Sequence, residues 1–426
     1  MSNPFLEGLE RVYLDPKLNP NSSLCTLMWY SLATNAFGSI RLCCKSYVSI
    51  IENGKELSLL DKSADEIWRG EAFTDIRKKM SDGVLLPECD VCIQEEAGKK
   101  CMSKRLKENR KYFERYDELQ LFPKPRYLSL NLGNRCNLMC RMCFSGLSNQ
   151  ILKETDELLS EPDNRKNFPE INLASHEVAK KSSTSSWIEN TNFLSQIDYS
   201  NLDEVYITGG EPLLHSSMYD VLQGCLDHGK TDILLRVQTN LTKVNQKFID
   251  MINQFERVQM VCSVDGINEL ANYVRYPSVW SEVERNFDYL CREFKTHIEM
   301  IAQVTVNTYN ILQLDDILRW VKMKADANPG RVVSTWFNPV HRPFGLSITT
   351  LPMELKMLVV ERLKALRPEY PNSQVTNQVE DLCRYIVERE AEEEHFQEFV
   401  RYTKMLDRKR GQNIVDFIPE LSPYFK

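Results

Sequence analysis

Three cysteines lie close together in the segment LGNRCNLMCRMCFSG, at Cys136, Cys140 and Cys143. Three thiolates can bind three irons of a cubane iron-sulfur cluster or three positions on one zinc ion. In both cases one metal position stays open for a ligand that is not protein, which is typical of catalytic metal sites. A zinc knuckle with a distant fourth ligand and a chance proximity of thiols are the alternative interpretations.

A second motif combines two glycines with a carboxylate. The strand-like run LDEVYITGG ends in Gly209 and Gly210, and Glu211 and Pro212 follow directly. Glycine lets the backbone approach a ligand closely, and the carboxylate offers a negative partner. A tight turn into a helix that starts at the proline is the alternative interpretation. Polar residues that come after later strand-like runs are Asn240, Ser263 and Arg275.

The elements that must position these residues are strand-like runs that alternate with helical stretches. The runs cover residues 126–132, 202–210, 232–240, 257–266, 297–307 and 331–340. Such alternation predicts βα units and an α/β fold, here a partial (β/α)6 barrel with a parallel sheet. Ligands bind at the carboxyl ends of parallel strands, where both motifs fall.

The remaining segments suggest further domains. Residues 146–198 form a long insertion in the barrel, interpreted as a mobile lid or as a solvated loop without a role. The last part of the chain shows helical apolar spacing with dense charges, which predicts outer helices. We therefore expect a small cysteine-rich domain over 1–122, the barrel over 123–345 and a helical extension over 346–426.

The cysteine triad after the first strand and GGEP after the second resemble the radical S-adenosylmethionine (radical SAM) enzymes. The resemblance implies a [4Fe-4S] cluster whose free iron binds the amino and carboxylate groups of S-adenosylmethionine. Reductive cleavage would release a 5'-deoxyadenosyl radical that removes a hydrogen atom from the substrate. It also implies that the triad Cys136, Cys140 and Cys143 is catalytic, and that the cofactor is bound by Gly209, Gly210, Glu211, Asn240, Ser263 and Arg275.

A second group of cysteines precedes the barrel, at Cys25, Cys43, Cys89 and Cys92. Their spacing resembles the auxiliary-cluster half of SPASM and twitch domains, which usually follow the barrel. The resemblance implies an auxiliary [4Fe-4S] cluster with closed coordination, suited to electron transfer; a structural four-thiolate zinc site is the alternative. Cys44 and Cys101 are alternate ligands. Further residues that fit the twitch-type pattern are Trp68, Arg77, Gly83, Glu96 and Arg105.

Composition limits the compartment and the partners. The chain has 426 residues, 13 cysteines and a formal net charge of -7, and its pI is near 5.6. This charge disfavours nucleic acid as a partner. Unpaired cysteines in such number favour metal binding in a reducing compartment. The sequence lacks a signal-like or membrane-spanning stretch, so we expect a cytoplasmic protein with no membrane partner.

Together these features predict a radical SAM enzyme that takes hydrogen from a peptide, a protein or a small metabolite. An electron donor such as flavodoxin or ferredoxin is expected as a partner, and the auxiliary cluster is expected to assist electron transfer. Modification of a nucleotide or sugar by the same chemistry is one alternative. A non-catalytic iron-sulfur or zinc protein that binds a partner is the other.

Overall fold

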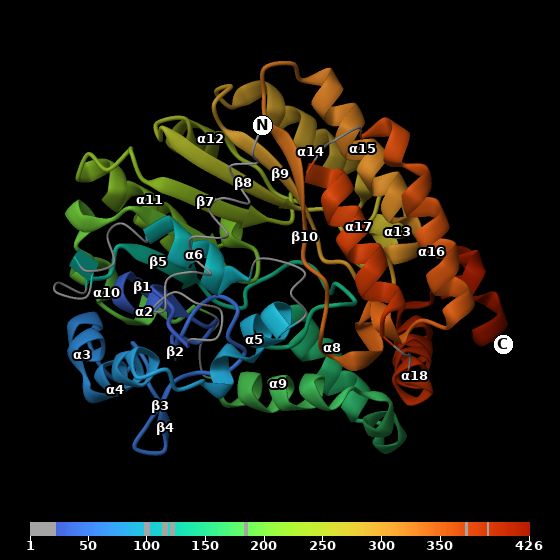
Figure 1. Ribbon diagram of the computed structural model, residues 1–426, viewed down its shortest axis with the longest axis horizontal. Coiled ribbons are helices and arrows are strands. Elements are labelled where there is room, and N and C mark those ends of the chain that lie inside the picture. Colours follow the sequence, from blue (N-terminus) through green and yellow to red (C-terminus); the bar gives the residue numbers. More distant parts are fainter. Residues whose placement is uncertain are drawn as a thin grey trace. The chain divides into compact units, whose positions relative to one another are not determined.

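The structure is a computed structural model that describes residues 23–97, 103–112, 118–119, 124–182, 186–370, 374–389 and 392–426. Cys101, one of the alternate ligands, lies outside the described residues. The chain divides into two compact units, whose elements are labelled in Figure 1. Unit 1 comprises Met1–Gly133, Ser186–Gly209 and Ser216–Leu235, and unit 2 comprises Asn134–Ser185, Gly210–His215 and Arg236–Lys426.

Unit 1 contains a sheet in which the strands are ordered β6-β5-β1-β2. Strand β5 pairs in parallel with both β1 and β6, and β2 pairs antiparallel with β1. The elements of this unit are α2 (Leu27–Tyr30), β1 (Ser31–Thr34), β2 (Ile40–Arg41), β3 (Ile51–Glu52), β4 (Lys55–Glu56), α3 (Ala64–Arg69), α4 (Glu71–Ser81), α5 (Asp90–Ala97), α6 (Lys104–Tyr112), β5 (Tyr127–Asn131), α10 (Phe193–Gln196), β6 (Glu204–Thr208) and α11 (Ser216–Asp227).

Strand β7 (Leu234–Thr239) has residues in both units. Unit 2 contains β8, β9 and β10, ordered β10-β9-β8 with parallel pairing throughout. Its elements are α8 (Asn149–Leu159), α9 (Glu170–Lys181), α12 (Gln246–Ile252), β8 (Arg257–Ser263), α13 (Asn268–Val274), α14 (Trp280–Glu293), β9 (Glu299–Val304), α15 (Leu314–Ala327), β10 (Val333–Phe337), α16 (Met353–Ala365), α17 (Gln374–Val387) and α18 (Glu393–Arg410).

The expected α/β class is confirmed, because each of the six strand-like runs contains one of the strands β5 to β10. Helix α14 shows how the helices follow from sequence: its apolar residues recur at helical spacing and are buried, namely Trp280, Val283, Phe287 and Leu290. Strand β1 was not predicted, since a run of four residues is too short to show a period. The expected C-terminal helices are present as α16, α17 and α18.

The insertion at 146–198 is largely helical where it is described. Within unit 2, α8 and the segment that follows it pack against α18 through an apolar cluster made by Leu158, Phe168, Tyr402, Met405 and Leu406. The interpretation as a solvated loop is therefore wrong for α8, because this helix buries side chains in the core. No helix among the described residues is long and apolar enough to cross a bilayer.

Candidate functional site

The three cysteines of the central motif lie on one loop of unit 2, between Asn134 and α8. All three thiols are half-buried. Burial, and then the nearby Cys140 thiol, raise the pKa of Cys136 to about 12. Burial, and then Cys140, also raise the pKa of Cys143. Each proton is therefore held tightly in the metal-free protein, and a bound metal must displace it to obtain thiolate ligands.

Helix α8 holds the first cysteine in place. The Cys136 N–H donates to Asn149 Oδ1 at 3.1 Å, and the Asn149 N–H donates to Asn134 O at 2.7 Å. Ser148, which caps the helix by accepting from the Ile151 N–H, also donates to the Leu138 carbonyl at 2.7 Å. These residues were missed in the sequence, although a serine before a helical run is a recognisable cap signal.

Glu211 presents a fully buried carboxylate in the same unit. Its oxygens accept hydrogen bonds from the Asn240 N–H at 2.6 Å, the Thr239 hydroxyl at 2.9 Å and the Leu213 N–H at 3.1 Å. Burial raises the pKa of Glu211 to about 7, although these donors and Arg275 oppose the shift. A buried carboxylate with such a pKa gains from a cationic ligand, for example the ammonium group of S-adenosylmethionine.

The two glycines before Glu211 have backbone conformations that other residues rarely adopt, with φ of +105° at Gly209 and +38° at Gly210. A Cβ on Gly210 would clash with the carbonyl oxygen of Arg135, and one on Gly209 would clash with the Asn131 side chain. Glycine is therefore required at both positions for steric reasons. The tight-turn interpretation holds as well, since a 3-10 turn follows at Pro212–Leu214.

Arg275 forms an ion pair with Asp265. The Asp265 side chain is buried and that of Arg275 is 11% exposed, and Asp265 also accepts from the Thr305 N–H at 2.6 Å. Among the described residues, the buried Arg275 Nε has no hydrogen-bond partner. This donor fits an anionic group such as the cofactor carboxylate.

Asn240 directly follows β7, and Ser263 is the last residue of β8, so both lie at strand ends as predicted. The Asn240 side chain donates to Asn137 Oδ1 at 3.0 Å and accepts from the Thr242 hydroxyl at 2.6 Å. Since Asn137 belongs to the cysteine motif, Asn240 contacts the loop that carries the thiols. Ser263 is buried at 9% exposure, and its role stays a prediction.

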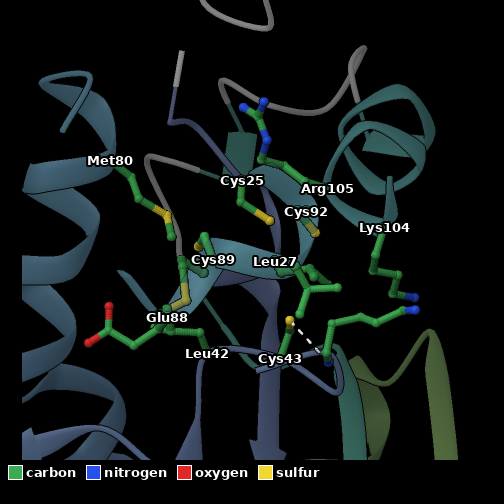
Figure 2. Close-up of a pocket in the computed structure, with 13 residues that line it drawn as sticks. Cys25, Leu27, Leu42, Cys43, Met80, Glu88, Cys89, Cys92, Lys104 and Arg105 are labelled. Carbon is green, nitrogen blue, oxygen red and sulfur yellow. Dashed lines mark hydrogen bonds between the residues drawn. The ribbon is translucent and has the colours of Figure 1, made fainter. Parts of the chain in front are cut away.

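The four N-terminal cysteines line one pocket in unit 1, together with Leu27, Met28, Leu42, Lys45, Met80, Glu88, Val91, Lys104 and Arg105. Figure 2 shows Cys25, Cys43, Cys89 and Cys92 around this pocket, and the Lys45 N–H donates to Cys43 Sγ at 3.4 Å. Burial raises the pKa of Cys25 well above its ordinary value, and the other three thiols raise it further. The four thiols are therefore neighbours in one pocket.

Residues of the twitch-type pattern support this pocket. Arg105 forms an ion pair with Glu96, and its Nη1 donates to the Leu24 carbonyl at 3.2 Å, one residue before Cys25. The Arg77 guanidinium lies 4.5 Å from the centre of the Trp68 ring. Four of the singled-out residues thus form two contacting pairs in unit 1.

Within the described ranges, no three Cys, His, Asp or Glu side chains are arranged to hold one metal ion. In a cubane cluster each thiolate binds a different iron, so the sulfur atoms stand farther apart than around one ion. The alternate ligand Cys44 is exposed, whereas Cys25 and Cys92 are buried.

The comparisons with known proteins each cover only part of the chain. Residues 130–321 match the family model of the Radical SAM superfamily. An uncharacterized protein of Methanocaldococcus jannaschii is 26% identical over 144 residues, which are 33% of this chain and 39% of that protein. SuiB of Streptococcus suis bound to S-adenosylmethionine is 14% identical with a TM-score of 0.36, over 71% of this chain and 61% of SuiB. A tagged form of anSMEcpe with bound AdoMet is 15% identical with a TM-score of 0.35, over 57% of this chain and 60% of that one.

The chain spans less than two thirds of the length of each of these relatives. Structural similarity at this level identifies no substrate. The family match contains the cysteine triad, Glu211 and Arg275, the residues that the structure gathers in unit 2. Residues 130–321 of this chain therefore form a radical SAM domain.

Proposed function

We propose that the protein is a radical SAM enzyme that abstracts hydrogen from a peptide, a protein or a small metabolite. When bound, a [4Fe-4S] cluster and S-adenosylmethionine would supply reductive cleavage of the sulfonium bond and radical hydrogen abstraction. The observation that carries the proposal is the buried Glu211 carboxylate, which three donors fix in the same compact unit as the cysteine triad.

Each proposed cofactor residue has a separate task. Cys136, Cys140 and Cys143 would hold three irons and leave the fourth open. The Glu211 carboxylate would face the methionyl ammonium, and Gly210 would let the backbone approach it. The unused Arg275 Nε would donate to the methionyl carboxylate. Gly209, Asn240 and Ser263 are proposed to complete the cofactor contacts.

For the N-terminal pocket we propose an auxiliary [4Fe-4S] cluster on Cys25, Cys43, Cys89 and Cys92. Support comes from the four thiols that line one pocket and from the N–H that donates to Cys43 Sγ. Four protein ligands leave no iron open, so this cluster would pass electrons between the substrate and a donor such as flavodoxin or ferredoxin. Because such clusters and donors belong to a reducing compartment, the proposed location is the cytoplasm.

Two alternative functions share part of the proposed assignment of cofactors and residues. Modification of a nucleotide or sugar would use the same cofactors and differ only in substrate. A non-catalytic protein with zinc at the N-terminal cysteines would need neither S-adenosylmethionine nor the buried Glu211 carboxylate.

Iron analysis of anaerobically reconstituted protein tests the assignment. The wild type should carry about eight irons, and the triple variant Cys136→Ala, Cys140→Ala and Cys143→Ala should retain about four. Cys383→Ala, which alters an isolated buried thiol, is the matched control and should keep the full iron content. Unchanged iron in the triple variant would refute the proposed cluster site.

Cofactor cleavage provides the second measurement. With dithionite and S-adenosylmethionine, the wild type should form 5'-deoxyadenosine, whereas Cys140→Ala should form none. The double variant Cys89→Ala and Cys92→Ala should retain some cleavage but lose substrate turnover, provided that circular dichroism shows a folded chain. Zinc in place of iron at the N-terminal site would favour a structural role for that site.

A further inference from the structure

Arg141 lies inside the cysteine motif, between Cys140 and Cys143, and its side chain is completely buried. The guanidinium lies 3.6 Å from the centre of the Tyr273 ring. A buried charge is costly unless it is paired and hydrogen-bonded, so the partner of Arg141 determines whether this loop conformation is stable.

That partner comes from the C-terminal helix α18, which lies beyond the family match at 130–321. Arg141 Nη2 donates to Asp407 Oδ1 at 2.6 Å and to Gln412 Oε1 at 2.8 Å. Asp407 also accepts from the Tyr273 hydroxyl at 2.9 Å and from the Ile414 N–H at 2.8 Å. The carboxylate therefore accepts three hydrogen bonds, which fix it in position.

The same loop is bonded to the segment that carries Arg275. The Met139 N–H donates to Tyr276 O at 2.6 Å, and the Arg141 N–H donates to Val274 O at 2.8 Å. In addition, Arg141 Nε donates to the carbonyl of the residue before Val274, at 3.1 Å. These three bonds enclose Arg275 on both sides, so a shift of Arg141 moves the thiols and this guanidinium together.

Helix α18 reaches the loop by a second route. Arg410 forms a bidentate pair with Glu154 on α8, at 2.8 and 2.6 Å, and both side chains are buried. Helix α8 begins at Asn149, which accepts from the Cys136 N–H. One helix of the C-terminal extension thus supports the motif near its first cysteine and between its last two.

We propose that Asp407 is a positioning residue for the reaction. Through Arg141, it holds the cysteine triad and Arg275 in fixed positions relative to one another. The statement that this positioning serves a reaction rests on the proposed function. The alternative is that Asp407 only stabilises the packing of α18. The two interpretations predict different results for a substitution of Asp407. Loss of a positioning residue affects the triad and cofactor binding selectively, whereas loss of a packing residue affects unit 2 as a whole.

The test compares Asp407→Asn with Lys409→Gln in the full-length chain. Lys409 lies on the same helix and forms a surface ion pair with Glu157 at 2.6 Å, and its side chain is 37% exposed. In metal-free protein, we expect Asp407→Asn to speed labelling of the triad thiols by a thiol reagent about tenfold, while the core thiols Cys262 and Cys291 keep the wild-type rate. In reconstituted protein, binding of S-adenosylmethionine should weaken by about 10- to 100-fold. Lys409→Gln should change neither quantity, and Asp407→Glu should restore part of both.

Wild-type labelling rates together with wild-type cofactor affinity in Asp407→Asn would overturn the inference, as would equal acceleration at Cys262 and the triad. If Asp407→Asn does not fold, Gln412→Ala replaces it in the same comparison. This substitution removes the second acceptor of Arg141 Nη2 and leaves Asp407 in place. Selective acceleration of the triad then supports the inference, and equal rates overturn it. The labelling result needs no cluster, so it stands even if reconstitution shows that the proposed function is wrong.

Discussion

Glu211→Gln should change how the stability of the metal-free protein depends on pH. The wild-type carboxyl has a pKa of about 7 in the folded state, raised by burial from an ordinary value of 4.5. Between these two values the folded state binds a proton that the unfolded state has released. Stability therefore falls as pH rises through this interval, and it levels off above the folded pKa. The glutamine variant has no such proton.

The size of the effect follows from the same two values. An interval from 4.5 to about 7, at about 1.36 kcal/mol per pH unit, corresponds to about 3 kcal/mol. In the variant, an amide nitrogen also faces hydrogen-bond donors such as the Asn240 N–H, whose nitrogen lies 2.6 Å from Glu211 Oε2 in the wild type. That cost does not depend on pH, so it shifts the whole curve and leaves its slope unchanged.

Urea unfolding of reduced, metal-free protein between about pH 5 and about pH 8 measures this slope. The free energy of unfolding of the wild type minus that of Glu211→Gln should fall by about 2.5 kcal/mol across the range, because pH 5 already lies above the unfolded pKa. Glu157→Gln, which alters a surface ion pair, is the control, and its free energy of unfolding should depend on pH as that of the wild type does. A difference between wild type and Glu211→Gln that stays constant with pH would refute the reasoning, because the carboxyl would then titrate alike in both states.

Two further substitutions test the steric and electrostatic supports of the sites. Gly210→Ala should destabilise the fold by about 3 kcal/mol in urea unfolding, since the new Cβ meets the Arg135 carbonyl at a positive φ. Gly330→Ala, where φ is +87° but the space is open, should cost only about 1–2 kcal/mol, and equal losses would contradict the steric argument. Glu96→Gln should cost about 3–5 kcal/mol and lower iron retention at the N-terminal cysteines, because it leaves the buried Arg105 charge without its carboxylate. Unchanged iron content in that variant would show that the ion pair of Glu96 and Arg105 does not support the pocket.

The sequence determined strands β5 to β10 and both motifs. Alternating runs marked β5 to β10, because a strand buried in a parallel sheet is a local apolar pattern. The spacing of Cys136, Cys140 and Cys143, and the glycines before Glu211, are also local. Such features can be read without knowing what packs against them. The four N-terminal cysteines were found by spacing as well, since each pair lies within a short stretch.

Only the tertiary structure decided what supports these residues. Nothing near Arg141 in the sequence indicates Asp407, which lies 266 residues away, and a single carboxylate in a charged helix has no distinctive pattern. The ion pair of Asp265 with Arg275 and the contact of α8 with Cys136 were not predicted for the same reason. A periodic apolar pattern reports which face of an element is buried, but a buried ion pair depends on two distant positions. The identity of its partner is fixed only when the chain folds.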